Sequence, residues 1–152
     1  MQKITPFLWF EKDIKDIIAF YKSVFPGTQS SGQSELEDTP SGTANMATLT
    51  IFGTQISIMT AGPYLPFNPT VSFIISCETV EEVDVLWEKL TSTGTVLMEL
   101  ASYPFAEKYG WVKDRYGVSW QIMFSSTMKA PQKVTPTLMF AGDVCGRAQE
   151  AK

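Results

Sequence analysis

The sequence predicts an α+β protein made of two tandem βαβββ modules. Two observations predict this class. The order of one strand, one amphipathic helix and three further strands occurs twice, on either side of a proline-rich stretch at residues 62–69. Each expected helix also begins at a residue type that favours helix N-termini and carries apolar residues at helical spacing. Runs of strands with the helices set apart from them are typical of the α+β class.

The first module spans about residues 3–61 and opens with a strand and a helix. Residues 4–10 are apolar with a loose alternation and no glycine, which predicts the strand. Asp13 is placed to cap the helix, and Pro26-Gly27 ends it. The helix has an apolar face at helical spacing, formed by Ile14, Ile17, Ile18, Tyr21 and Phe25.

The same module closes with a polar segment and a hairpin. Residues 29–42 are rich in Ser, Gly and acids, which indicates a strand edge that leads into a mobile loop around residues 38–42. Residues 46–52 and 55–60 are hydrophobic runs joined at Gly53-Thr54, and this spacing predicts a hairpin with a two-residue turn. The prolines that follow exclude a helix or a central strand, so the next stretch is a linker.

The second module spans about residues 69–125 and repeats this order. Residues 70–77 are β-branched and aromatic, which predicts a strand. Thr79 and Glu82 form a Thr-x-x-Glu capping box at the start of the second helix. The apolar face of that helix consists of Val80, Val83, Trp87 and Leu90. Three strands then follow, which we expect at residues 96–100, 110–113 and 119–124.

The chain also contains the beginning of a second copy of its own first module. Residues 3–14 return as residues 133–144, with six of twelve positions identical. Self-similarity at a long period indicates repeated structural units. We therefore divide the chain into a domain at residues 1–126 and a segment at residues 127–152, which holds a linker and the start of a second repeat. The segment is either the front of a longer, truncated parent protein or a remnant docked on the first unit.

Composition excludes several classes of function. The net charge of −4 and the pI near 4.8, without a cluster of Lys or Arg, argue against nucleic-acid binding. Nothing approaches 18 consecutive apolar residues, and no signal peptide is visible, so we expect no membrane span and a cytoplasmic location. Cys77 and Cys145 lie far apart in the sequence, which fits reduced thiols. The chain has no histidine, which excludes Ser-His-Asp and Cys-His catalysis.

Tandem modules of this order resemble the vicinal oxygen chelate superfamily, which includes glyoxalase I, extradiol dioxygenases and bleomycin-resistance proteins. The most specific segment is residues 110–122, Gly-Trp-Val-Lys-Asp-Arg-Tyr-Gly-Val-Ser-Trp-Gln-Ile. Residues 8–10 with 19–26, and residues 68–73 with 81–87, extend the match. These segments resemble the PhnB-like branch, whose members often carry the name 3-demethylubiquinone-9 3-methyltransferase. The chain has no Gly-x-Gly-x-x-Gly to hold an adenosyl cofactor.

The resemblance implies that each module curls into half of a cup that encloses a site. In metal-dependent members each module supplies two ligands, and the matching positions here are Pro6, Thr70, Gln121 and a position in residues 55–60 that holds no carboxylate. A divalent ion needs three or four good donors, and this set offers one amide oxygen. We therefore expect no metal and no other cofactor.

Five side chains are candidates for contact with a ligand in the cup. The amide of Gln121 could fix a ligand through its donor and its acceptor, or it could be a buried Gln satisfied by its neighbours. The aromatic candidates lie on expected central strands, and alternation predicts that about half of them face the cup: Trp9, Phe73, Trp111 and Trp120. Such a lining would suit a flat ligand, but core packing also accounts for four tryptophans.

Tyrosines near the expected loops offer a different chemistry. Tyr64, Tyr103 and Tyr109 would rim the cup, and tyrosine can act as a general acid. Nothing near them in the sequence would lower the pKa of their hydroxyls. This candidate is therefore weaker than the cup residues.

These observations predict a metal-free protein that binds or sequesters a small molecule. One alternative is an enzyme of the same superfamily with a non-histidine site, acting as a lyase, a dioxygenase or a methyltransferase. Another is a structural or regulatory half-domain whose role lies in pairing with its own repeat or with another chain. The resemblance implies a homodimer. We also expect the apolar segment with Val134, Leu138, Met139 and Phe140 to pack on the first domain or on a partner chain, because an exposed apolar edge favours association.

Overall fold

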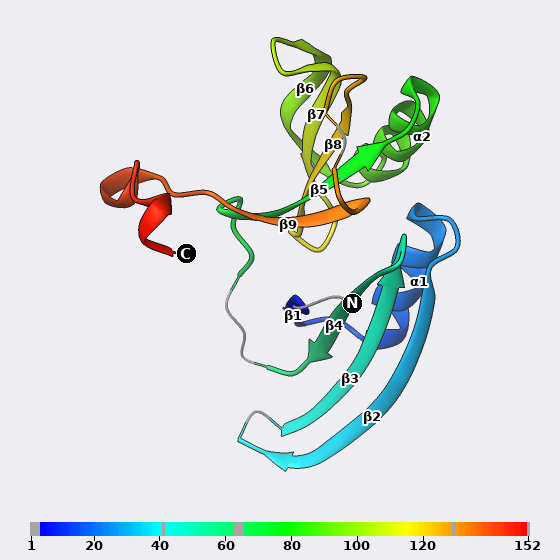
Figure 1. The fold of residues 1–152 in the computed structure, drawn as a ribbon. Helices are drawn as coiled ribbons and strands as arrows, with labels where there is room; N and C mark the ends of the chain where they lie inside the picture. Colours follow the sequence, from blue (N-terminus) through cyan, green and yellow to red (C-terminus); the bar gives the residue numbers. More distant parts are fainter. Residues whose placement is uncertain (1–3, 41, 63–65, 129, 152) are drawn as a thin grey trace. The chain divides into compact units, whose positions relative to one another are not determined.

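The computed structural model describes residues 4–40, 42–62, 66–128 and 130–151, and it confirms the α+β class with two βαβββ modules. The chain forms two compact units, each with one helix and one sheet (Figure 1). Unit 1 comprises Met1–Pro66 with Pro131–Val134, and unit 2 comprises Phe67–Ala130 with Thr135–Lys152. No helix within the described ranges has the length and apolar character that crossing a bilayer requires.

Unit 1 is a four-stranded sheet with one helix. The strand order is β1-β4-β3-β2, and β1 runs parallel to β4 while the other pairs are antiparallel. Asp13 caps the helix as predicted, since its Oδ1 accepts a hydrogen bond of 2.7 Å from the Lys15 amide. The elements are β1 (Phe7–Phe10), α1 (Ile14–Val24), β2 (Gln29–Thr39), β3 (Gly42–Ile51) and β4 (Thr54–Thr60).

One face of the unit 1 sheet packs against α1. The Phe10 ring meets the Tyr21 ring of α1 at 6.3 Å between centroids, so the alternate residue Leu8 faces the helix as well. The five apolar helix residues predicted from the sequence are all buried. Trp9 points to the opposite face because side chains alternate along β1.

Two expectations for unit 1 were wrong. The strand edge expected in residues 29–42 is present as β2, but the strand runs on to Thr39 and β3 begins at Gly42, so the loop expected around residues 38–42 was wrong. Pairing with β3 supplies the backbone hydrogen bonds of β2 while its polar side chains stay in solvent. The hairpin turn between β3 and β4 is Phe52-Gly53 and not Gly53-Thr54. Both turn residues have positive φ, 48° for Phe52 and 82° for Gly53, which is the backbone of a type I′ turn.

Unit 2 is a five-stranded sheet with one helix, in the order β6-β7-β8-β5-β9. The predicted capping residue is confirmed, because the Thr79 hydroxyl accepts from the Glu82 amide at 3.2 Å. The Glu82 carboxylate in turn accepts from the amide of Glu78 at 2.9 Å. The elements are β5 (Val71–Cys77), α2 (Val80–Thr91), β6 (Thr95–Tyr103), β7 (Ala106–Lys113), β8 (Ser119–Phe124) and β9 (Val134–Leu138).

The helix α2 covers one face of the unit 2 sheet. The ring of Trp87 lies so close to Gly110 of β7 that a Cβ there would meet it at 2.5 Å. Lys108 of β7 forms an ion pair with Asp84 of α2. These contacts assign Lys108, Gly110 and their cross-strand partners to the helix face, and the alternate residues to the opposite face, which we call the open face.

The repeated segment at the end of the chain forms β9 and two short 3-10 turns. Val134 is fully buried, and its carbonyl accepts from the Thr54 hydroxyl within unit 1 at 3.3 Å. In unit 2, the Met139 amide donates to the Thr70 carbonyl at 2.8 Å. The expected start of a helix is instead η1 (Gly142–Val144) and η2 (Ala148–Ala151), since Gly146, which falls between them, adopts a φ of 84° that regular helix does not allow.

Candidate functional site

The candidate site is the open face of the sheet in unit 2. Strand register places its residues in rows across β5, β8 and β7. The central row is Ile74, Gln121 and Trp111. The rows on either side are Ser76, Met123 and Tyr109 at one end, and Ser72, Ser119 and Lys113 at the other. The face is therefore apolar in part, with polar groups in each row.

Gln121 lies at the centre of a hydrogen-bonded chain on this face. Its Oε1 accepts from the Tyr109 hydroxyl at 2.7 Å. Its Nε2 donates to the Ser72 hydroxyl at 2.7 Å. Ser72 is only 2% exposed and Tyr109 only 5%, whereas Gln121 is half-buried. The amide is thus held in one orientation by two buried partners from neighbouring strands.

Trp111 is held on the same face by a similar contact. Its indole Nε1 donates to the Ser119 hydroxyl at 2.6 Å, and Ser119 is 1% exposed. The indole is half-buried, so part of the ring remains accessible beside Gln121. The site therefore presents an oriented amide next to an oriented aromatic ring.

An aromatic cluster lies where β6 turns into β7. Tyr109 makes edge contacts with Tyr103 at 5.5 Å and with Phe105 at 5.0 Å between ring centroids. Tyr103 and Phe105 stack at 5.6 Å. Burial of the hydroxyl, and secondly the neighbouring Tyr103, raise the pKa of Tyr109 to about 12. Tyr109 therefore stays protonated near neutral pH and donates to Gln121.

The five predicted candidates fall into three places. Gln121 and Trp111 lie on the open face of unit 2. Phe73 and Trp120 lie on the helix face, packed against each other at 5.0 Å and no more than 1% exposed, so they are core residues. Trp9 belongs to unit 1, where its indole donates to the Ala61 carbonyl at 2.7 Å.

Sequence reasoning missed the serines that orient the site. Ser72 and Ser119 alternate with buried aromatic residues in β5 and β8, which is the one sequence signal that could have marked them as facing the same side. Tyr109 was expected only as a rim residue, and the structure places it in direct contact with Gln121. Tyr64 lies outside the described residues.

The donor set does not fit a divalent metal ion. In unit 2 the matching positions are Thr70 and Gln121, which offer one amide oxygen and no carboxylate. The matching strand of unit 1 contains no carboxylate. Within the described ranges, no three Cys, Asp or Glu side chains gather closely enough to hold an ion. Hard and borderline divalent ions need more and better donors than these.

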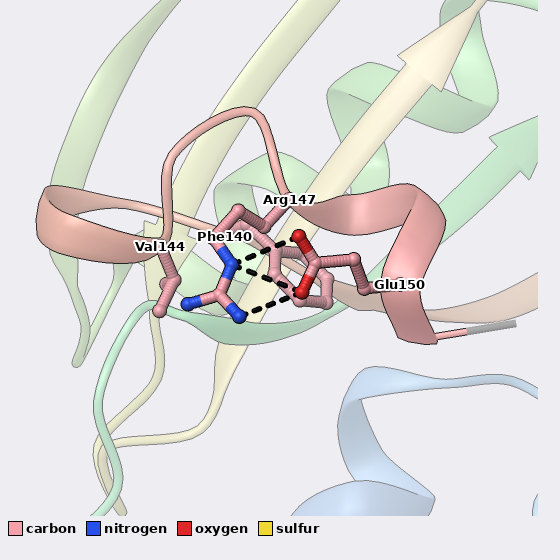
Figure 2. A pocket seen from close by; sticks show the side chains of 4 residues that line it. All are labelled: Phe140, Val144, Arg147 and Glu150. Carbon is pink, nitrogen blue, oxygen red and sulfur yellow. Dashed lines mark hydrogen bonds and ion pairs between the residues drawn. The ribbon is translucent and has the colours of Figure 1, made fainter.

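A hollow lies among the terminal 3-10 turns (Figure 2). It has a volume of about 220 Å³ and is lined by Phe140, Val144, Arg147 and Glu150. The Arg147 guanidinium and the Glu150 carboxylate neutralise each other, with an Nη2 to Oε2 distance of 2.6 Å. Because Arg147 and Glu150 are exposed and already pair with each other, this hollow is a weaker candidate for a ligand site than the open face.

Comparisons with known proteins match most of the chain. A family model described as 3-demethylubiquinone-9 3-methyltransferase matches residues 2–123. A solved structure of a Bacillus cereus PhnB protein, provisionally described as a 3-demethylubiquinone-9 3-methyltransferase, is 37% identical to this chain. The match has a TM-score of 0.68 and covers 82% of this chain and 100% of that one. The comparison with curated proteins gave no match.

More distant structures share the fold. The fosfomycin resistance protein FosX of Listeria monocytogenes is 15% identical, with a TM-score of 0.63 over 84% of this chain and 96% of that one. A glyoxylase/bleomycin resistance protein/dioxygenase domain from Frankia sp. EAN1pec is 17% identical, with a TM-score of 0.61 over 82% and 98%. At these identities the likeness concerns the fold alone.

Proposed function

Because the chain belongs to the 3-demethylubiquinone-9 3-methyltransferase (PhnB-like) family of the vicinal oxygen chelate superfamily, we propose that it binds a small molecule without a metal, at the open face of unit 2. Proteins of this superfamily include antibiotic resistance proteins and enzymes, so the fold is compatible with either role. The site residues that we assign are Gln121, Tyr109 and Trp111.

The observation that carries the proposal is the unused hydrogen-bonding capacity of an amide held in place. Gln121 uses one N–H towards Ser72 and one lone pair for Tyr109. A carboxamide has a second N–H and a second lone pair. A ligand can therefore bond to both edges of this amide without the entropic cost of ordering it.

The surroundings of Gln121 favour a ligand with a flat apolar part. The half-buried side chains of Ile74, Met98, Trp111 and Met123 flank it on the same face. Small-molecule sites are mostly apolar with a few oriented polar groups, and this composition agrees with that pattern. Aromatic rings stack favourably on an indole such as Trp111.

The test is a ligand screen by thermal shift and native mass spectrometry with aromatic amides, phenols and acids. We expect at least one compound to raise the Tm of the wild type and to appear as a one-to-one adduct. Gln121→Leu should bind it about fivefold more weakly, because a hydrogen bond to an oriented amide contributes about 1 kcal/mol. Gln132→Leu, an exposed change in the connecting segment, should bind as the wild type does.

Two outcomes would overturn the proposal. One is a stoichiometric divalent ion in the purified protein by elemental analysis. The other is a screen in which Gln121→Leu and the wild type bind every hit equally. Turnover of a hit in glyoxalase, dioxygenase or methyl-transfer assays would instead support the enzyme alternative at the same face.

We further propose that the protein is a cytoplasmic homodimer. The exposed apolar residues Leu138 and Met139, 64% and 43% accessible, are a physical reason for association. Sedimentation of the purified protein tests the oligomeric state, and a monomer over the micromolar range would contradict it. Cell fractionation tests the location.

A further inference from the structure

The open face of unit 2 has a different chemical character at each end of β7. The Tyr109 end carries the aromatic cluster with Tyr103 and Phe105. The other end carries Lys113, in one row with Ser119 and Ser72. Trp111 and Gln121 lie between the two ends. A ligand that follows the strand would meet aromatic rings first and a cation last.

Lys113 is a cation without a carboxylate partner among the residues that the structure describes. Along the described chain no ion pair involves it, although its side chain is half-buried. Lys108 on the same strand points to the helix face and is paired with Asp84. A half-buried ammonium gains most from an anion, because charge-assisted hydrogen bonds are roughly twice as strong as neutral ones.

The neighbours of Lys113 in its row favour an anion as well. Ser119 uses its oxygen to accept from Trp111, and Ser72 uses its oxygen to accept from Gln121. Both hydroxyls are neutral and buried, so they add no negative charge beside Lys113. The carboxylate on the same side of β7, Glu107, lies six residues away, about 20 Å along a strand, and is held by the Ser126 amide. The Lys113 end of the face is therefore positive.

The length of the face sets the size of the ligand. Tyr109 and Lys113 are four residues apart on one strand, which is about 13 Å. Two linked aromatic rings that carry a carboxylate span a similar length. Resting on the function proposed above, we infer that the ligand is an elongated aromatic carboxylate, with its rings beside Trp111 and the aromatic cluster and its carboxylate at Lys113.

The experiment compares two probes of the same shape, biphenyl-4-carboxylate and biphenyl-4-carboxamide, by isothermal titration at low salt. The wild type should bind the carboxylate about tenfold more tightly than the carboxamide. Lys113→Gln should remove this preference, because it should weaken carboxylate binding much more than carboxamide binding. The matched control is Lys108→Gln, which removes the same charge from the opposite face of the same strand and should retain the preference.

Three results would overturn the inference: no preference between the probes in the wild type, equal weakening of both probes by Lys113→Gln, or no binding of either probe. Gln121→Leu separates this inference from the proposed function. If Gln121→Leu weakens both probes while Lys113→Gln changes neither, the binding site stands and only the ligand class fails. If Gln121→Leu changes neither probe, the site itself fails.

Discussion

Asp114 organises the turn between β7 and β8 through three hydrogen bonds. Its Oδ1 accepts from the Tyr116 and Val118 amides at 2.9 and 3.0 Å. Its Oδ2 accepts from the Trp120 indole at 2.8 Å, and the residue is only 3% exposed. A carboxylate accepts with both oxygens, so all three donors are satisfied by one side chain.

Asp114→Asn should destabilise unit 2. The side-chain amide of Asn has an oxygen on one side and an NH2 donor on the other. In either orientation the NH2 group faces an N–H group, of the turn or of Trp120, and cannot accept from it. The loss should be about 1–3 kcal/mol in the free energy of unfolding by urea, since buried donors are left unsatisfied. Asp143→Asn at an exposed position is the control and should have no effect. Equal stability of the two variants would contradict this account of the turn.

Tyr109 predicts a dependence of stability on alkaline pH. Its folded pKa of about 12 lies above the ordinary value of 10.0. Above pH 10 the unfolded chain loses the proton while the folded protein keeps it, so stability falls as pH rises from 10 towards 12. The stability difference between the wild type and Tyr109→Phe should therefore shrink across this range in denaturation curves. A constant difference would show that the hydroxyl is not buried as described.

At the scale of elements, the hairpin of β3 and β4 depends on two residues with left-handed backbone. Phe52 has this left-handed backbone, and its ring contacts two neighbours. The ring centroids of Phe52 and Phe25 are 5.9 Å apart, and the Lys133 ammonium lies 5.0 Å from the Phe52 centroid. Gly53 has a φ of 82° and no atom near the place of a Cβ. The cost of a side chain at Gly53 is therefore one of backbone strain alone.

Gly53→Ala should lower the stability of the protein by about 1–2 kcal/mol, the cost of a left-handed residue with a Cβ. Gly62→Ala is the matched control, because its surroundings are also open and its φ is not in the left-handed region. Thermal unfolding by calorimetry would measure both. If the two variants unfold at the same temperature, the turn does not have the described backbone.

The sequence predicts the helices of this protein better than it predicts the pairing of its strands. The period of apolar residues and the caps Asp13 and Thr79 predict both helices, because these signals lie within a few residues of each other. The register between strands is a long-range property. Trp111 and Trp120 both lie on predicted strands, yet only pairing across β7, β8 and β5 decides that one faces outward and the other is buried.

The Gln121 site shows the same limit. Its partners Tyr109 and Ser72 lie 12 and 49 residues away in the sequence. The resemblance to a known family pointed to Gln121 as a position, but only the sheet brings its partners together. The full extent of the polar strand β2 was not predicted for a related reason, since its stability comes from pairing with β3 and not from its own composition.

At the scale of the whole molecule, the repeated segment is part of the folded protein. Val134 is fully buried, and β9 extends the sheet of unit 2 beside β5. We expected the segment to pack on the first domain or on a partner chain. In the structure it pairs with a strand of its own chain. The domain boundary near residue 126 remains a prediction.

Val134→Ala should destabilise the protein by about 1–3 kcal/mol, because it removes two methyl groups from a buried position. Val144→Ala, at a residue that is 42% exposed, is the control and should change stability by less than about 0.5 kcal/mol. Urea unfolding would measure both variants. A mild effect at Val134 equal to that of the control would mean that Val134 is not buried in solution as described.

The position of β9 has a consequence for synthesis on the ribosome. β5 emerges early in the making of unit 2, whereas β9, the strand that covers its outer edge, is translated after the other described strands of the same sheet. Until then, the backbone amides and carbonyls along that edge of β5 lack their strand partner, and an open edge invites pairing with another chain. The nascent protein should therefore depend most on chaperones late in translation, after Phe124 has emerged and before Leu138 follows.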